Sequence, residues 1–115
     1  MNVISVGIDV VDVKRFRSVL KTRKDRFIEN TFSKKEQGYC FSYKDPGLHF
    51  AGTFAAKEAT QKAANLFHLS PRQIEIIRTK DGKPKVMIKG KFSRNILISI
   101  SHEKDIACAY ALYQK

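Results

Sequence analysis

The chain has 115 residues, 43% hydrophobic and 29% charged, which is typical of a globular protein with one hydrophobic core. Twenty-two Lys and Arg against eleven Asp and Glu leave a formal net charge of +11, so nucleic acid, a phosphorylated substrate or an acidic protein is the expected partner. No apolar run approaches the roughly 20 residues of a membrane span, and the N-terminus lacks the pattern of a signal peptide. Cys40 and Cys108 lack metal-type spacing, which favours reduced thiols in a cytoplasmic protein.

The N-terminal segment predicts a strand followed by a basic helix. Residues 3–8 are apolar on both faces, which is typical of a central strand, and Asp9 follows where that strand is expected to end. Asp12 is a good N-cap for a helix over about residues 13–23. The basic residues of this helix are Lys14, Arg15, Arg17, Lys21 and Arg23. We expect their face either to be simply solvated or to dock an acidic helix.

Helical segments occupy the middle of the chain. Residues 26–30 predict a short helical or irregular piece. Ser33 and Glu36 have the spacing of a capping box, so a helix is expected to begin there. After a turn at residues 43–47, the alanine-rich segment 50–64 predicts the longest helix of the chain.

The last part of the chain predicts two β-hairpins. Four segments with strand character follow in pairs, at residues 74–78, 85–88, 96–101 and 106–113. The dipeptide Asp81-Gly82 is a strong hairpin signal in the first pair, and residues 102–105 connect the second. A strand, then helices, then two hairpins favours the α+β class. We expect a single domain over residues 1–115, with the central helix against a mainly antiparallel sheet.

One carboxylate of the long predicted helix lies in an unusual place. At about 100° per residue, Glu58 projects between Phe54 and Ala51, inside the apolar arc of the helix. A carboxylate there needs a cation or a metal, because burying it unpaired is costly. An ion pair with Lys62, in the favourable i,i+4 order, and a ligand site are about equally well supported by this segment alone.

A second carboxylate is Asp9 at the expected strand end, and together with Glu58 it has the makings of a metal site. Two carboxylates with water and substrate oxygens are typical of Mg²⁺, although these residue types do not distinguish Mg²⁺ from Mn²⁺. Lys57 and Lys62 lie on the same helix and are placed to neutralise phosphate oxygens. His102 either donates to a phosphate or packs as a neutral loop residue. The residue types together indicate magnesium and phosphate.

Five short segments carry a pattern that extends over nearly the whole chain. They are Gly7-Ile8-Asp9-Val10-Val11-Asp12, Phe32-Ser33-Lys34-Lys35-Glu36 followed by Tyr39-Cys40, Phe54-Ala55-Ala56-Lys57-Glu58-Ala59, Asp81-Gly82-Lys83-Pro84, and Ile98-Ser99-Ile100-Ser101-His102. In order and separation these segments resemble the signatures of the holo-acyl-carrier-protein synthases, which are small 4'-phosphopantetheinyl transferases.

The resemblance implies an activity and a set of site residues. Such enzymes transfer phosphopantetheine from coenzyme A to a serine of apo acyl carrier protein, for fatty acid biosynthesis, and release 3',5'-ADP. By resemblance, Asp9 and Glu58 are the magnesium ligands, and Glu58 is the candidate to accept the serine proton. Lys62 is implied as a catalytic residue that also holds coenzyme A phosphates. The other coenzyme A contacts that the resemblance implies are Lys57, Gly82, Lys83, Pro84 and His102.

The resemblance also implies partners. Lys14, Arg15 and Lys21 are expected to dock the acidic carrier protein, which gives the charge of +11 a specific purpose. Family members of this length are homotrimers with active sites between neighbouring subunits. Two departures from the family pattern affect local detail: Thr53 stands where arginine is usual, and residues 65–71 replace a glycine-rich stretch.

A basic nucleic-acid-binding module is the alternative from another class of function. It explains the charge, and Phe or Tyr side chains stack on bases in such modules. The chain has no helix-turn-helix, RNA-recognition or zinc-finger signature, and this alternative leaves Glu58 unexplained. A catalytically idle homologue is disfavoured by the presence of Asp9, Lys57, Glu58 and Lys62. We therefore expect neither nucleic acid nor a membrane as partner.

Overall fold

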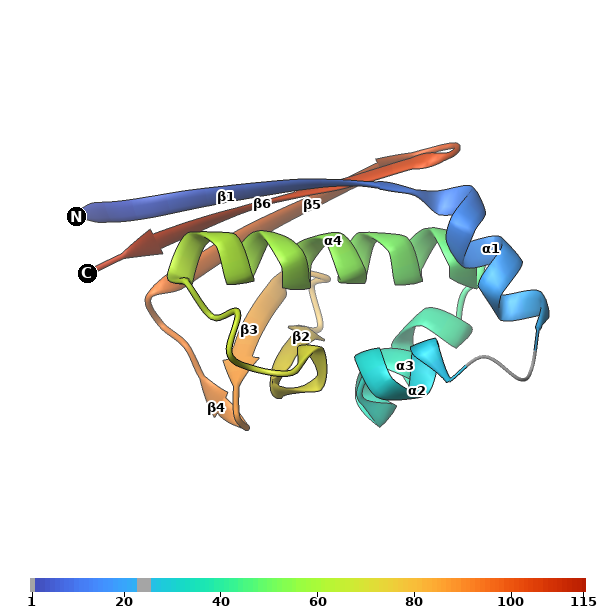
Figure 1. Cartoon of the computed structure of the whole chain (residues 1–115), viewed down its shortest axis with the longest axis horizontal. Helices are drawn as coiled ribbons and strands as arrows, with labels where there is room; N and C mark the ends of the chain where they lie inside the picture. Colours follow the sequence, from blue (N-terminus) through green and yellow to red (C-terminus); the bar gives the residue numbers. More distant parts are fainter. Residues whose placement is uncertain (1, 23–25) are drawn as a thin grey trace.

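The structure is a computed structural model of the whole chain and describes residues 2–22 and 26–115. A long helix, α4 (Pro46–Ala64), lies between two layers (Figure 1). On one side of α4 is an antiparallel sheet in the order β1 (Val3–Asp12), β6 (Ile106–Gln114) and β5 (Ile96–Glu103). The short helix α1 (Val13–Lys21) follows β1 directly. The residue at which this helix was predicted to end, Arg23, lies outside the described residues.

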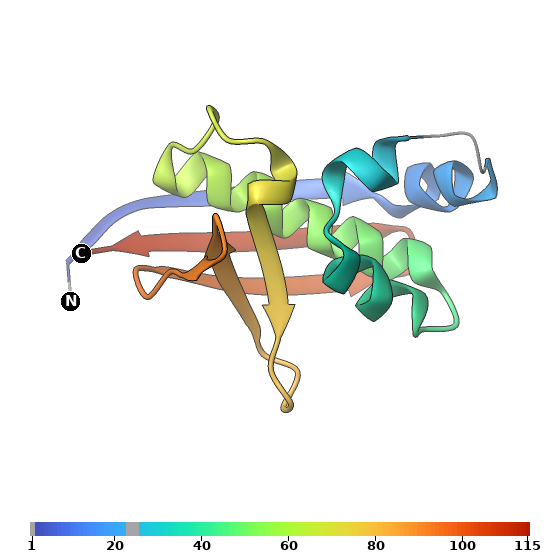
Figure 2. The ribbon, with the colours of Figure 1, turned by 90° about the horizontal axis from the view of Figure 1, so that it is seen from below.

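The second layer consists of a smaller antiparallel sheet and two short helices. Its strands are in the order β2 (Ile74–Arg78), β3 (Pro84–Ile88) and β4 (Lys91–Phe92), and its helices are α2 (Phe27–Thr31) and α3 (Lys34–Phe41). Figure 2 shows the β2–β3 hairpin crossing the strands of the first sheet, and β3 contacts β5. The predicted α+β class with a central helix against antiparallel strands is confirmed. No helix of the described residues is long and apolar enough to span a membrane.

The prediction that the first strand is central is wrong, because β1 is an edge strand and β6 is the central one. On the face toward α4, Gly7 and Val11 are buried. The opposite face of β1 is apolar and uncovered, with exposed fractions between 50% and 65% for Ile4, Val6, Ile8 and Val10. The strand also continues to Asp12, so that Asp9 lies within it, opposite Ala109 of β6, rather than beyond its end.

Small residues allow α4 to lie close against the first sheet. Ala107, Ala109 and Ala111 of β6 are buried beneath the helix. A Cβ atom added at Gly7 would overlap the carbonyl oxygen of Ala59 and lie 2.9 Å from the backbone nitrogen of Ala63. The absence of a side chain at Gly7 therefore sets how closely β1 approaches α4, and with it the distance between the functional groups that the two elements carry.

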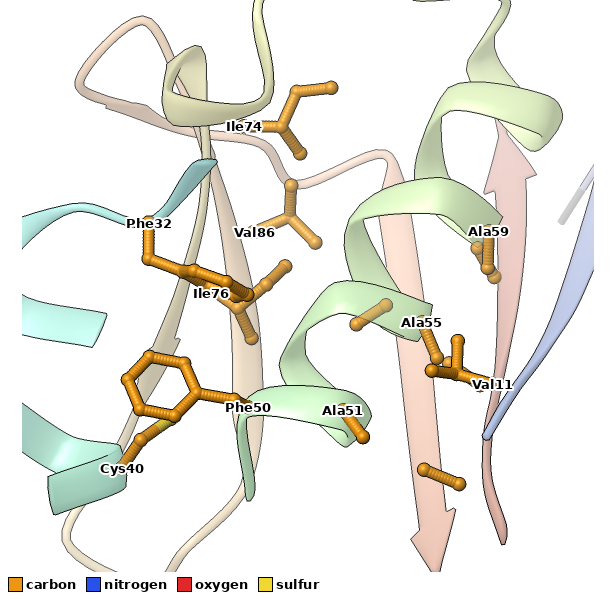
Figure 3. Close-up of a cluster of buried hydrophobic side chains, with 14 of the residues drawn as sticks. Val11, Phe32, Cys40, Phe50, Ala51, Ala55, Ala59, Ile74, Ile76 and Val86 are labelled. Carbon is orange, nitrogen blue, oxygen red and sulfur yellow. The ribbon is translucent and has the colours of Figure 1, made fainter. Parts of the chain in front are cut away.

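Larger side chains fill the other side of α4. Figure 3 shows Phe50 of α4 beside Phe32, with Ile74, Ile76 and Val86 of the second sheet next to them. The rings of Phe32 and Phe50 meet edge to face with their centroids 4.9 Å apart, a favourable aromatic geometry. The core therefore occupies both faces of α4.

Several local predictions are confirmed in detail. The side chain of Asp12 accepts a hydrogen bond from the backbone N–H of Lys14 and caps α1. Ser33 and Glu36 form the predicted capping box of α3. The helix α4 begins at Pro46, earlier than the predicted residue 50, because proline fits the first turn of a helix.

Both hairpins are present, with small differences from the prediction. Gly82 has a φ of +85° in the turn of the first hairpin, a conformation that favours glycine. The two-residue strand β4 was not predicted. His102 lies in β5 rather than in the connection, which is formed by Lys104 and Asp105.

Candidate active site

The first group of candidate residues lies where β1 faces the middle of α4. Asp9 of β1 and Glu58 of α4 line one surface cavity of about 340 Å³, together with Arg15 of α1 and Phe54 of α4. The alternating pleat of β1 turns Asp9 to the same face as Gly7 and Val11, which is the face toward α4. The two carboxylates that the sequence singled out are therefore brought together.

Lys62 joins this cavity through Asp9. Its ammonium nitrogen lies 3.3 Å from Oδ1 of Asp9 and donates a 2.9 Å hydrogen bond to the carbonyl oxygen of Ile8. Among the described residues, the ion pair of Lys62 is thus with Asp9, and the alternative pair with Glu58 on the same helix is not formed. Among the residues that the structure describes, Glu58 therefore has no ion-pair partner of its own.

The surroundings of Glu58 disfavour its negative charge. Its half-buried position, and secondarily the nearby carboxylate of Asp9, raise the pKa of Glu58 above its usual value, while Lys62 and Arg15 act in the opposite direction. The described residues contain no cluster of three or more possible metal-ligating side chains. Two carboxylates suffice for Mg²⁺, which binds few protein ligands and takes substrate phosphates and water for the rest. The donor set therefore fits this ion.

Arg15 lies at the rim of the same cavity on a cluster of aromatic rings. Its guanidinium carbon is 5.6 Å from the ring centroid of Phe27, 5.8 Å from that of Phe54 and 5.9 Å from that of Phe16. Cation–π contacts of this kind restrict a side chain that is otherwise exposed. Arg15 therefore presents a positioned positive charge beside the two carboxylates.

The other basic residues of α1 differ in how free their charges are to bind a partner. Lys14 and Lys21 are exposed, and Lys14 forms only a weak ion pair with Asp105 at 3.6 Å. Arg17 instead donates hydrogen bonds of 2.8 Å to Asp45 and 2.6 Å to Asp105, and these bonds lower the pKa of both carboxyl groups. Arg17 thus ties α1 to the start of α4 and to the β5–β6 turn.

The second group of candidate residues lies in a groove of about 660 Å³ between β5 and the β2–β3 hairpin. Gly82, Lys83, Pro84 and His102 all line it. Its other basic lining residues are Arg78, Lys85, Arg94 and His49, none of which the sequence reasoning had assigned to the site. Among the described residues that line this groove, none is Asp or Glu. Such a surface attracts an anionic ligand.

The two groups lie on opposite edges of the first sheet. Asp9 is on β1 and His102 on β5, with β6 between them, so the edge strands are about 10 Å apart at the usual strand spacing. Both side chains lie on the face of the sheet that carries α4, one on each side of that helix. The structure therefore assembles Asp9, Glu58 and Lys62, and separately Gly82, Lys83, Pro84 and His102.

The expectation that Lys57 contacts coenzyme A does not agree with its position. Lys57 is 1% exposed, and its ammonium lies 2.8 Å from Glu36, which is likewise buried. It also donates to the carbonyl oxygens of Pro71 at 2.8 Å and Ile74 at 2.6 Å. The carboxylate of Glu36 and the two carbonyl oxygens thus use the hydrogen-bonding capacity of the Lys57 ammonium. Residues seven positions apart lie on the same face of a helix, and Phe50, seven positions before Lys57, is buried in the core. That spacing was the signal in the sequence that Lys57 faces the core rather than the cavity.

Comparison with known proteins agrees with this arrangement. A sequence model described as the 4'-phosphopantetheinyl transferase superfamily matches residues 5–111, which include both groups of site residues. The chain therefore belongs to the 4'-phosphopantetheinyl transferase superfamily. Its relatives there are holo-[acyl-carrier-protein] synthases. That of Thermodesulfovibrio yellowstonii is 39% identical over 108 residues, which is 93% of this chain and 95% of that protein.

Solved structures of such synthases share the fold. The synthase of Bacillus anthracis in complex with CoA (3',5'-ADP) aligns with a TM-score of 0.83 and 27% identity, over 100% of this chain and 99% of that one. The synthase of Helicobacter pylori in complex with coenzyme A aligns with a TM-score of 0.79 and 29% identity, over 95% of this chain and 99% of that one.

Proposed function

We propose that this chain transfers the 4'-phosphopantetheine group of coenzyme A to a serine of apo acyl carrier protein, as a step that serves fatty acid biosynthesis. The observation that carries the proposal is the carboxylate pair of Asp9 and Glu58, flanked by Lys62 and Arg15, in a chain whose relatives are holo-[acyl-carrier-protein] synthases. We take residues 1–115 as one domain that supplies all of these groups.

The carboxylate pair is suited to Mg²⁺ or Mn²⁺, which Asp9 and Glu58 would hold. When bound, such an ion supplies positive charge that offsets the charge of the coenzyme A pyrophosphate. The serine oxygen attacks the phosphorus that bears the pantetheine, and the bond from that phosphorus to the departing adenosine 3',5'-bisphosphate breaks. Glu58 accepts the serine proton. Lys62 neutralises a phosphate oxygen.

The acid-free groove is suited to the nucleotide end of coenzyme A. The turn formed by Gly82, Lys83 and Pro84 lies at one wall of the groove, and His102 lies at another. Lysine and histidine side chains there supply charge-assisted hydrogen bonds to phosphate oxygens. Lys57 is not included among these contacts because its amine is enclosed in the core.

We propose that two chains form a complete site, because the carboxylate pair and the groove lie on opposite edges of one sheet. We propose the homotrimer that the family resemblance implies, with the β1 edge of one subunit beside the β5 edge of the next. The uncovered apolar face of the first sheet supports self-association. Its exposed residues include Val6, Ile8 and Val10 of β1 with Ile106 and Tyr110 of β6.

The carrier protein is proposed to dock on α1. Lys14, Arg15 and Lys21 are exposed there, and Arg15 is beside the carboxylate pair, so an acidic carrier would present its serine to Glu58. We expect the reaction to take place in the cytoplasm, with Cys40 and Cys108 as the free thiols that the structure shows.

The test is the intact mass of apo acyl carrier protein after incubation with the purified chain, Mg²⁺ and coenzyme A. The expected result is the mass increase of one phosphopantetheine group. No increase with any carrier tried, including one from the same organism, would contradict the proposal. Saturable binding of nucleic acid at moderate salt, without carrier modification, would favour the alternative function.

A further inference from the structure

Two histidines from different elements meet at the end of the groove that lies against α4. The rings of His49 in α4 and His102 in β5 have their centroids 5.2 Å apart and are nearly perpendicular, with an interplanar angle of 77°. Tyr43 stacks on His49 with a centroid distance of 3.7 Å, and Tyr39 meets the same ring edge-on at 6.0 Å. The tyrosines thus fix the plane of His49, and both histidines line the groove.

A basic side chain in this part of the groove, Arg78, has a buried nitrogen without a hydrogen-bond partner among the described residues. The guanidinium of Arg78 lies 4.6 Å from the ring centroid of Tyr39, and Arg78 lines the same groove. One of its terminal nitrogens, Nη1, is buried and makes no hydrogen bond. Leaving a buried charged donor unpaired is costly, so this nitrogen points to an acceptor that a ligand supplies.

The charges around His49 also favour an anion. Burial, followed by the neighbouring His102 and Arg78, lowers the pKa of His49, and Asp45 opposes them. The carboxylate of Asp45 is already engaged by Arg17. The two tyrosines that contact the ring are titratable as well. An anion in the groove would reverse the unfavourable effect of His102 and Arg78.

We propose that His49 is a phosphate-binding residue that acts together with His102 and Arg78, and that its ligand is the phosphomonoester on the ribose of coenzyme A. The inference rests on the proposed function, which supplies coenzyme A as the ligand. In the proposed function, the pyrophosphate of coenzyme A binds beside Asp9 and Glu58, which the β1 edge of the neighbouring subunit supplies. The ribose phosphate is therefore the anion left for this end of the groove. Two imidazoles and a guanidinium offer donors to several of its oxygens at once.

The assignment predicts a specific dependence on pH. Phosphate binding requires the imidazolium form of His49, and its lowered pKa means that this form is scarce in the empty groove at pH 8. Binding therefore takes up a proton and strengthens as the pH falls from 8 to 6. Removal of His49 should reduce this strengthening, whereas protonation of the phosphate itself affects the wild-type protein and the variant alike.

The experiment is calorimetric titration at pH 6 and pH 8 with coenzyme A and with 3'-dephospho-coenzyme A, which lacks the ribose phosphate. His49→Phe preserves an aromatic ring against Tyr43, His49→Gln preserves a hydrogen-bonding group, and His68→Gln is the control at an exposed position. We expect both His49 variants to bind coenzyme A about tenfold more weakly at pH 6, with a smaller loss at pH 8. Affinity for the dephospho ligand should be unchanged, and the control should behave as wild type.

The outcomes separate this inference from the proposed function. If wild-type protein binds coenzyme A but the His49 variants bind it equally well, the assignment of His49 is wrong. Equal losses for both ligands would also overturn it, because His49 would then act through the shape of the groove. Wild-type protein that binds neither ligand contradicts the proposed function itself, and the assignment of His49 with it.

Discussion

The buried ion pair between Lys57 and Glu36 leads to the sharpest stability prediction. Lys57→Met keeps an unbranched side chain of similar length in the core but removes the ammonium group. Glu36, which has no exposed side-chain surface, would then keep only its hydrogen bonds from the backbone N–H groups of Ser33 and Ile76. The carbonyl oxygens that Lys57 binds, on Pro71 and Ile74, would also lose their donor.

The magnitude follows from leaving one charge buried without its partner. Removing one member of a buried pair typically costs about 3–5 kcal/mol, which is a large part of the roughly 5–15 kcal/mol that stabilises a domain. The pKa of Lys57 is lowered chiefly by burial, so desolvation already offsets part of what the pair contributes. In the double variant Lys57→Met with Glu36→Gln, no buried charge remains. We expect that variant to recover about 1–3 kcal/mol relative to the sum of the single losses.

Urea unfolding followed by circular dichroism measures these free energies. The matched control is Lys62→Met, since Lys62 is on the same helix but forms a partly exposed ion pair, which should cost less than about 1 kcal/mol. Folded Lys57→Met should retain the wild-type affinity for coenzyme A. A variant as stable as wild type that binds coenzyme A more weakly would refute this reasoning and restore Lys57 as a ligand-binding residue.

Two further predictions concern the carboxylate pair and the basic helix. Glu58→Gln should abolish carrier modification, yet raise the melting temperature of the metal-free protein at pH 7, because the raised pKa of Glu58 means that its charged form destabilises the fold. This gain in melting temperature should shrink as the pH falls toward the ordinary pKa of glutamate. A Glu58→Gln variant that keeps full turnover would show that the assignment of Glu58 is wrong. Arg15→Glu should weaken carrier binding at least tenfold with a smaller effect on coenzyme A, because Arg15 is positioned on its aromatic rings beside the site. Lys35→Glu, an equal charge change at an exposed position of α3, is the control, and equal losses of carrier binding in both variants would count against docking on α1.

Local features of this fold follow well from the sequence. The caps at Asp12 and Ser33 and the Asp81-Gly82 hairpin depend on residues close in sequence, and the inward position of Glu58 depends on helix periodicity. The pairing of Glu58 with Asp9 was expected from the family resemblance. The prediction that β1 is a central strand failed, because apolar residues on both faces of a strand do not show how many strands flank it or what covers each face. In β1 one face is covered by α4, and the other is uncovered in the single chain.

The parts that the sequence did not reveal depend on segments far apart in the chain. Lys57 and Glu36 are 21 positions apart, and no local pattern indicates that one neutralises the other in the core. His49 and Arg78 reach the groove from α4 and β2, so their association with His102 depends on how the β2–β3 hairpin lies across β5. These are consequences of tertiary packing.

The central claim is that one active site is formed from the β1 edge of one subunit and the β5 edge of its neighbour. It is tested by mixing two inactive variants, Glu58→Gln and the double variant His102→Ala with Lys83→Ala, during co-expression. In randomly mixed trimers about a quarter of the interfaces combine an intact carboxylate pair with an intact groove. Carrier modification should therefore return to about a quarter of the wild-type rate. Mixed trimers that remain inactive would contradict a site shared between subunits.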